Sequence, residues 1–152
     1  MFRKAMLDDG KRVYQLICDM EKTELPYDPF IRIFRRQLED PRYYCLLMEK
    51  EGRVIGELNL RFEEQLHHCN RIAEILEFTV DEGWRNQGIG KEMLEEACRI
   101  AESAGCVQIE VACNQLRTDT HRFYLREGMH NFHYKFTKPL IGGGSEENAL
   151  GK

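Results

Sequence analysis

Apolar residues recur at helical spacing in four segments of the chain, and we expect a helix in each. The segments begin near Asp9, at Pro29, at Gly88 and at Thr118. The third has the most regular pattern. We expect it to end at Gly105, because helices often end on a glycine in the left-handed conformation. The fourth runs to Arg126 and is closed by Gly128.

Six shorter apolar or alternating segments predict strands. We expect them at residues 2–6, 43–48, 54–62, 72–80, 107–112 and 132–137. Glu51-Gly52-Arg53 predicts a tight turn between the second and third, and residues 63–70 predict a polar loop before the fourth. A run of antiparallel strands is followed by a half of the chain in which helices and strands alternate. This order predicts an α/β fold of the mixed (α+β) kind, with about six strands in one sheet and about four helices covering it.

The length of 152 residues suits one domain with its own core. We place this domain at residues 1–140 and a flexible tail at 141–152, where glycines, serine and glutamates show no apolar periodicity. No apolar run reaches the ~20 residues of a membrane span, and the N-terminus lacks the apolar core of a secretory signal. We therefore expect a cytoplasmic protein with no membrane partner and with reduced cysteines.

The formal net charge of −4 argues against nucleic acid as a partner, because general nucleic-acid binding needs a basic surface. Mild acidity excludes nothing else. The function must therefore be sought in local motifs.

The segment from Arg85 to Gly90 places two glycines where a strand passes into a helix. A backbone without Cβ can approach a bulky anion, and the first amides of a helix are unpaired at the positive end of its dipole. Lys91, just inside the helix, can add a cation. The spacing matches neither GxGxxG nor GxxxxGK[ST], so by itself it indicates only an anion site, which a diphosphate would fit.

The sequence around this segment resembles the central signature of the GNAT acetyltransferases, which is an apolar strand, a short acidic loop and Arg/Gln-x-x-Gly-x-Gly/Ala. Glu77 to Gly90 carries that pattern. Phe123 to Met129 resembles the second GNAT signature, an aromatic-Tyr pair shortly before Gly and a bulky apolar residue. The order of elements from Phe2 to Leu140 is similar too. The resemblance implies a GNAT fold, with a mostly antiparallel sheet, and direct acetyl transfer from acetyl-CoA to an amine.

A longer resemblance is to the aminoalkylphosphonate N-acetyltransferases, a GNAT subgroup. It covers Leu66 to Ile75, His121 to Gly128 and Phe136 to Lys138. It implies an N-acetyltransferase for a primary amine of a small molecule, with an aminoalkylphosphonate as the specific expectation. The alternatives are another amine (a polyamine, an amino acid, an aminoglycoside or a protein amine) and a non-catalytic acyl-CoA-binding sensor module.

Acetyl transfer needs a base for the ammonium group, a donor to the tetrahedral oxyanion and an acid for the CoA thiolate. Glu77 is the first candidate for the base, through a water molecule, because GNAT members often place a carboxylate here. Glu74 is its rival on the same strand, and the two should face opposite ways unless a bulge intervenes. Tyr124 matches the family's general acid, although a core tyrosine would also fit its helix.

The resemblance also implies which residues contact acetyl-CoA, chiefly through the end of the central strand and the glycine segment. The expected cofactor-binding residues are Phe78, Val80, Arg85, Asn86, Gln87, Gly88, Ile89, Gly90, Lys91 and Asn114. A backbone amide between Glu77 and Val80 is the expected oxyanion donor. Asn114 could equally be a simple turn residue.

The amine must be recognised by residues outside the glycine segment. The substrate-binding candidates are Tyr27, His67, His68 and His121. The cations available for a phosphonate are Arg61, Arg71, Arg122, Arg126 and Lys138. The subgroup leaves a divalent metal ion open, but no HxxxH or HExxH spacing supports one and we assign no metal ligand. A homodimer also stays open.

Overall fold

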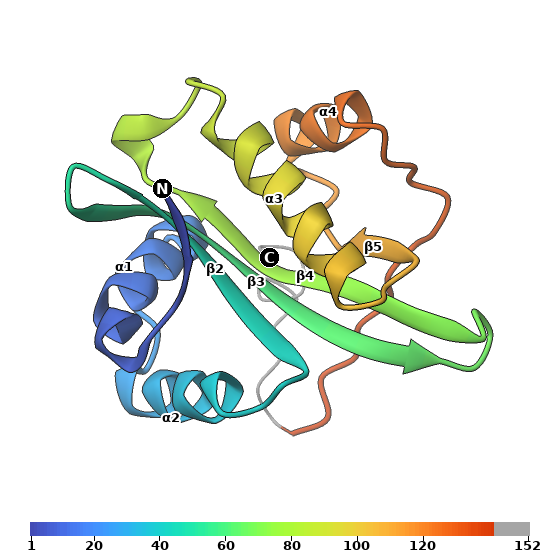
Figure 1. Ribbon diagram of the computed structural model, residues 1–152, viewed down its shortest axis with the longest axis horizontal. Helices are drawn as coiled ribbons and strands as arrows, with labels where there is room; N and C mark the ends of the chain where they lie inside the picture. The colour runs from blue at the N-terminus through green and yellow to red at the C-terminus, as the bar shows by residue number, and fades with distance from the viewer. Residues whose placement is uncertain (142–152) are drawn as a thin grey trace. The chain divides into compact units, whose positions relative to one another are not determined.

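The computed structural model describes residues 1–141, and the chain divides into two compact units. The first unit is residues 1–111 and contains the whole sheet, whereas the second begins at Ala112 (Figure 1). The predicted tail at 141–152 lies outside the described residues except for its first residue. The placement of a single domain at residues 1–140 stays a prediction.

The first unit contains five strands, three α-helices and two short 3-10 helices. In chain order they are β1 (Phe2–Lys4), η1 (Leu7–Asp9), α1 (Gly10–Glu21), α2 (Tyr27–Leu38), β2 (Tyr43–Lys50), β3 (Arg53–Gln65), β4 (Asn70–Val80), η2 (Glu82–Trp84), α3 (Ile89–Ser103) and β5 (Gln108–Val111). The sheet order is β1-β2-β3-β4-β5, antiparallel up to β4 and parallel between β4 and β5. The predicted mixed, mostly antiparallel sheet is therefore confirmed.

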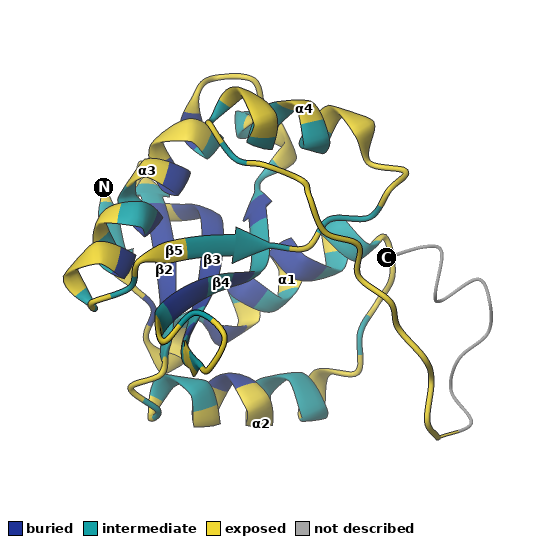
Figure 2. Ribbon diagram, turned by 90° about the vertical axis from the view of Figure 1, so that its right-hand side faces the viewer, coloured by how far each residue is buried: buried dark blue, intermediate teal, exposed yellow. Residues whose placement is uncertain are grey.

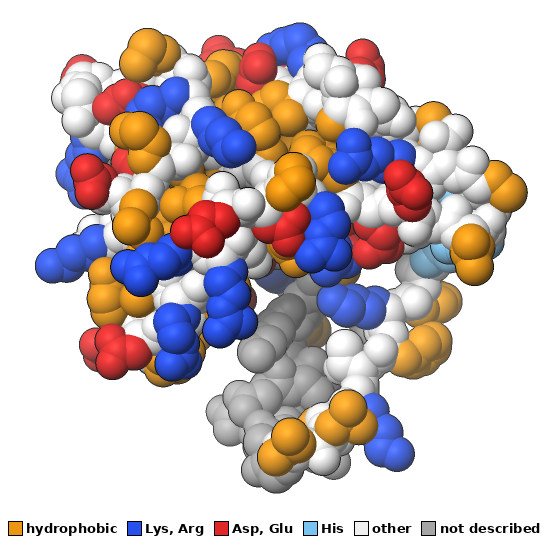
Figure 3. Space-filling view, turned by 60° about the horizontal axis from the view of Figure 1, so that its bottom comes forward, with side chains coloured by type: hydrophobic (Ala, Val, Ile, Leu, Met, Phe, Trp, Pro, Cys, Tyr) orange, Lys and Arg blue, Asp and Glu red, His pale blue; other side chains and the backbone are white. Residues whose placement is uncertain are grey.

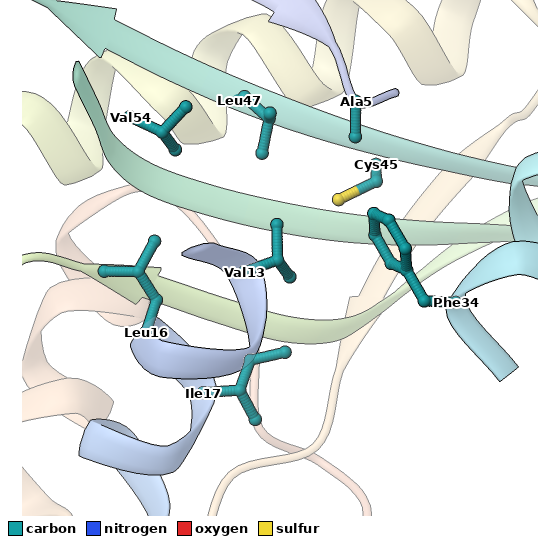
Figure 4. Close-up of a cluster of buried hydrophobic side chains, with 8 residues drawn as sticks. All are labelled: Ala5, Val13, Leu16, Ile17, Phe34, Cys45, Leu47 and Val54. Atoms are coloured by element: carbon teal, nitrogen blue, oxygen red, sulfur yellow. The ribbon is translucent and has the colours of Figure 1, made fainter. Parts of the chain in front are cut away.

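Helices cover both faces of this sheet in the first unit: α1 and α2 lie on one face and α3 lies on the other (Figures 1 and 2). On the first face, α1 and α2 bury apolar side chains against β1, β2 and β3. Figure 4 shows this cluster, which consists of Ala5, Val13, Leu16, Ile17, Phe34, Cys45, Leu47 and Val54. On the other face, α3 approaches closely at Gly56, where an added Cβ would lie 2.6 Å from the Met93 sulfur.

The hairpin of β3 and β4 is the longest pairing in the sheet, and it extends further than predicted. Residues 63–65 continue β3 and pair with residues 70–72, which leaves a turn of four residues in place of the expected loop at 63–70. The polar side chains there are compatible with a strand because ladder hydrogen bonds use the backbone.

A bulge interrupts this hairpin in its centre. Asn59 pairs with Glu77 but Leu60 pairs with Ile75, so Leu76 is an extra residue on β4. The bulge reverses the side-chain alternation of β4 on its two sides. It therefore decides which carboxylates share a face.

The predicted turn and helix ends are confirmed by backbone conformations. Glu51 and Gly52 have φ values of 54° and 73°, as a two-residue hairpin turn requires, and Gly105 has φ 84° after α3. In the second unit, α4 spans Thr118–Arg126, and Gly128 follows it with φ 87°. No helix within residues 1–141 has both the length and the apolar character to cross a bilayer.

The sixth predicted strand, at residues 132–137, does not form within the described part of the chain, so the count of about six strands is corrected to five. Phe132, Tyr134 and Phe136 alternate as in a strand, but they are 79%, 84% and 91% exposed. Alternation predicts how side chains would divide between two faces. It does not provide a partner strand, without which the backbone groups have no ladder.

Candidate active site

A group of polar side chains lies on the sheet face that α1 and α2 cover. β3 contributes Glu57 and Asn59, and β4 contributes Glu77 and Thr79. Glu57 is opposite Thr79, Asn59 is opposite Glu77, and Glu57, Asn59 and Thr79 are all buried. Polar groups are rarely buried without a reason, so this group is the strongest candidate for chemistry in the first unit.

Glu77 is held by a hydrogen-bonded chain that reaches α2. The Asn59 amide nitrogen donates to Glu77 Oε1 at 3.0 Å and to Gln37 Oε1 at 2.9 Å. Both N–H groups of Asn59 are therefore used, which fixes its orientation and with it that of the carboxylate. Such positioning favours a general base, which has to lie within hydrogen-bond reach of the proton it removes.

The proton affinity of Glu77 is also changed. Burial raises the pKa of its carboxyl group, the hydrogen bond from Asn59 opposes this, and the charge of Glu21 raises the pKa further. A carboxyl group with a raised pKa takes a proton more readily near neutral pH than an exposed one does. Position and proton affinity thus both suit a general base.

Glu74 faces the same side of the sheet as Glu77, because the bulge at Leu76 lies between them. Its partner in the register is Arg61, whose Nη2 donates to Glu74 at 2.8 Å and lies 3.4 Å from Glu63. Glu74 and Glu77 were expected to face opposite ways unless a bulge lay between them, and the bulge at Leu76 places them on the same face. Glu74 is engaged in an ion pair, whereas Glu77 is held only by a neutral amide in the contacts described above.

The glycine segment forms an exposed start to α3. Gly88 has φ 82°, and a Cβ added there would meet nothing within 4 Å. The first helical bond is from the Glu92 amide to the Gly88 carbonyl at 3.1 Å, so the amides of residues 89–91 precede the intrahelical ladder. These amides and Lys91 can accommodate an anion such as a diphosphate.

The neighbouring residues of this segment have different surroundings. Arg85 donates from Nε to the Val80 carbonyl at 3.0 Å, and Gln87 reaches the Gly83 carbonyl at 3.4 Å. Asn86 has φ 62°, a conformation that asparagine tolerates better than most residues. Ile89 is only 3% exposed, so its side chain belongs to the core and it can offer a ligand only its backbone.

Phe78 and Val80 lie near the end of β4, beyond its pairing with β5. The β4–β5 ladder ends at Ile75 and Val111, while β4 continues beside β3 to Val80. The Val80 carbonyl is the acceptor for Arg85, so the end of this strand and the glycine segment are directly joined.

Two of the histidines predicted to bind substrate, His67 and His68, lie far from Glu77 along the sheet of the first unit. His67 and His68 lie in the turn of the β3–β4 hairpin with ring centroids 4.2 Å apart, and His68 Nδ1 is 2.6 Å from Gln65 Oε1. The turn is seven residues from Glu77 along β4, or ~23 Å at the usual rise of a strand. Their role in substrate binding stays a prediction. Within residues 1–141, no three His, Cys, Asp or Glu side chains are grouped as a metal site would need.

Tyr27 begins α2, one of the two helices that cover the face of Glu77. Its ring meets Tyr14 edge-on at 5.0 Å, and Tyr14 meets Phe30 in the same way at 5.2 Å. Tyr27 is 40% exposed. It therefore offers an aromatic surface beside the helix pair, and its contact with a substrate stays a prediction.

The second unit holds Asn114, His121 and Tyr124. Asn114 Oδ1 accepts from the Leu116 amide at 2.8 Å, as a turn residue does, and His121 Nε2 lies 2.7 Å from the Asn114 carbonyl. Burial raises the pKa of Tyr124 to about 12, with a further increase from Cys113 and an opposing effect of Arg117. Tyr124 therefore keeps its proton at neutral pH, as a proton donor must.

The cations proposed for a phosphonate are engaged to different extents. Arg61 pairs with Glu74, Arg122 pairs with Asp119, and Arg71 donates to the Ala104 carbonyl at 2.8 Å and lies over the Phe62 ring. Among residues 1–141, Arg126 and Lys138 form no ion pair. These last two are the more available of the five.

Several residues of this site were missed in the sequence. Asn59 and Glu57 form no motif, since a polar residue at every second position of a strand also fits a solvated face. Gln37 lies near the end of α2 and forms no motif either. Helix α2 also carries three arginines, Arg32, Arg35 and Arg36. They are exposed, and Figure 3 shows Lys and Arg side chains gathered over this part of the surface.

The chain is similar to known acetyltransferases. The model of a family described as Acetyltransferase (GNAT) family matches residues 10–129. The chain is 41% identical over 138 residues to the aminoalkylphosphonate N-acetyltransferase of Salmonella typhimurium, and the match covers 91% of this chain and 90% of that protein.

Solved structures show the same fold at low sequence identity. A transcriptional regulator from Bacillus halodurans is similar with a TM-score of 0.85 and 21% identity, over 92% of this chain and 99% of that one. The glucosamine-6-phosphate N-acetyltransferase of Arabidopsis thaliana gives a TM-score of 0.76 and 21% identity, over 91% and 97%. The family match covers most of the chain and the curated relative nearly all of it, so the chain belongs to the GNAT family of acetyltransferases.

Proposed function

We propose that this acetyltransferase moves the acetyl group of acetyl-CoA to the primary amine of an aminoalkylphosphonate. The observation that carries the chemistry is the half-buried Glu77 carboxylate, which Asn59 orients and whose pKa is raised, chiefly by burial. The substrate class is supported by the 41% identity to an enzyme named for it. Other small amines are the competing substrates.

In this proposal Glu77 removes a proton from the substrate ammonium group, directly or through one water molecule. The freed nitrogen then attacks the acetyl carbonyl carbon, a C–N bond forms, and the C–S bond breaks as the tetrahedral intermediate collapses. Tyr124 gives its hydroxyl proton to the departing thiolate. The nitrogen loses its surplus proton to solvent, and Tyr124 regains a proton from solvent. Free alkylammonium groups titrate near ~10, so this first deprotonation is the step that needs a base.

The start of α3 is the proposed site for the diphosphate of CoA. Gly88 leaves space for it, the amides of residues 89–91 can donate to it, and Lys91 adds a positive charge. A backbone amide at the end of β4 is the proposed oxyanion donor. Asn114 is the proposed further contact from the second unit.

A phosphonate would need cations in addition to this base. Arg126 and Lys138 are the proposed partners from the sequence candidates, because they form no ion pair among the described residues. Arginine matches phosphonate oxygens with two parallel N–H groups, which favours Arg126. Tyr27, His67, His68 and His121 remain proposed substrate contacts.

The proposal is tested with a panel of amines. We expect thiol release from acetyl-CoA to be fastest, by kcat/KM, with aminoalkylphosphonates, and at least about tenfold slower with the matching alkylamines that lack the phosphonate, since that loss removes charge-assisted bonds. Polyamines, amino acids, aminoglycosides and peptide N-termini complete the panel. Preference for one of these would reject the phosphonate, and tight CoA binding without any turnover would favour a sensor.

Replacing the base tests its identity. Glu77→Gln should lower kcat by roughly 10²–10⁴-fold, and the wild-type rate should fall as pH drops through the raised pKa of Glu77, above the usual ~4.3 of a glutamate. Glu74→Gln is the matched control and should keep both the rate and the position of this acid limb. If Glu74→Gln shows the larger loss, Glu74 is the base.

Removing one hydroxyl tests the general acid. Tyr124→Phe keeps the ring and its packing, so we expect turnover to fall about 10- to 100-fold while the Kd of acetyl-CoA changes less than about twofold. Stopped-flow turnover and calorimetric titration provide the two numbers. Equal losses of rate and affinity would assign Tyr124 to binding.

The glycine segment is tested by steric blocking. Gly88→Val places a β-branched side chain at φ 82° in the space proposed for the diphosphate, and we expect the Kd of acetyl-CoA to rise about tenfold or more. Gly52→Val is the matched control, because Gly52 is also left-handed (φ 73°) and open but lies in the β2–β3 turn. An unchanged Kd in Gly88→Val, or an equal rise in Gly52→Val, would contradict the assignment.

A further inference from the structure

Glu57 is a titratable side chain in the core for which the mechanism above has no use. It is 0% exposed, and neither of its carboxyl oxygens has a hydrogen-bond partner among the described residues. Without a partner, an ionised carboxylate in such a place loses far more hydration free energy than the protonated acid does. The environment of Glu57 therefore favours the neutral acid.

The groups of residues 1–141 that act on Glu57 include no cation. From β4 it faces the Glu77 carboxylate and the Thr79 hydroxyl, and that hydroxyl is aligned on the Met20 sulfur of α1 at 3.2 Å. On β2, Leu47 is opposite Glu57 and Cys45 is opposite Asn59, and burial together with Glu57 and Glu77 raises the pKa of the Cys45 thiol. The remaining polar groups nearby are the carboxylate of Glu21 on α1, which acts on Glu77, and the amides of Asn59 and Gln37, which reach in from β3 and α2.

The strand register explains why the two carboxyl groups interact. Glu57 and Asn59 are two residues apart on β3, so they share a face, and Asn59 lies opposite Glu77. Glu57 is therefore the diagonal neighbour of Glu77 across an antiparallel pair, a separation over which side chains still interact. Ionisation of both carboxyl groups is unfavourable, because the charge of Glu77 raises the pKa of Glu57.

We propose that Glu57 is a positioning residue for Glu77: the two carboxyl groups form a pair that holds one proton, and Glu57 carries it while Glu77 is ionised. The pair then has a single negative charge, placed on the member that Asn59 orients. When Glu77 takes the ammonium proton, both members are neutral, and loss of that proton to solvent restores the starting state. This inference rests on the proposed role of Glu77 as the base.

The pair has a predicted effect on stability whose sign follows from the pKa of Glu57. Burial and then Glu77 raise this pKa well above its usual value, against a smaller opposing effect of the Thr79 hydroxyl. The unfolded chain loses this proton at the ordinary carboxyl pKa, but the folded chain keeps it to higher pH, so the acid lowers stability as pH rises. Glu57→Gln keeps the shape and removes the titration. Its Tm should exceed that of the wild type at neutral pH, and the difference should disappear near pH 4.

The closing experiment compares the wild type with Glu57→Gln, Glu57→Ala and the surface control Glu96→Gln, whose carboxylate pairs with Arg99 on α3. Infrared spectra at neutral pH should contain the band of a buried protonated carboxyl group in the wild type and in Glu96→Gln, and should lack it in both Glu57 variants. This readout does not depend on turnover. A missing band in the wild type, or one that survives in Glu57→Gln, would overturn the proton assignment even if the enzyme acetylates phosphonates as proposed.

Kinetics then test the positioning role separately. Glu57→Gln should keep kcat at neutral pH within about threefold. In the wild type, ionisation of Glu57 at high pH places a second anion beside Glu77 and causes an alkaline inflection of the pH profile, which Glu57→Gln should lack. Glu57→Ala should lower kcat at least about tenfold with little change in the KM of acetyl-CoA. If Glu57→Gln does not rescue that loss, or keeps the alkaline inflection, Glu57 only fills space.

Discussion

The long antiparallel pairing of β3 and β4 is the constraint on which the candidate site depends. Its register places Asn59 opposite Glu77 and Glu57 opposite Thr79, and α1 and α2 then cover that face. Backbone hydrogen bonds along both strands hold this arrangement. The backbone that carries the buried polar side chains is therefore already ordered by the ladder, which lowers the entropy cost of bringing them together. Burying polar groups costs free energy unless they are hydrogen-bonded, and the rigid ladder keeps these groups in one geometry.

The bulge at Leu76 has an effect larger than its size. By adding one residue to β4 it turns Glu74 and Glu77 to the same face, where one is neutralised by Arg61 and the other is held by a neutral amide. The same two residue types thus acquire different chemistry from their partners alone. Glu74 is paired with the Arg61 guanidinium, whereas burial raises the pKa of Glu77, so that Glu77 accepts a proton more readily.

The chain divides the chemistry of acetyl transfer between kinds of structure. A helix start with an open, left-handed glycine suits the anionic part of a cofactor, because it supplies backbone donors that need no side chain. A buried strand suits the base, because desolvation adjusts its proton affinity. Glucosamine-6-phosphate and aminoalkylphosphonate enzymes share this fold with the chain, which illustrates that the fold and the amine vary separately.

The sequence alone determined the local elements, since helical periodicity, turn residues and the glycine segment each act over a few residues: α4 and the β2–β3 turn lie where they were predicted. It also determined the family through two motifs. It did not determine the bulge, the Asn59–Gln37 bond, the isolation of Glu57 or the missing pairing of residues 132–137. Those depend on which strand or helix arrives at each side chain, and only the tertiary structure decides that, because contacts between distant segments leave no local pattern.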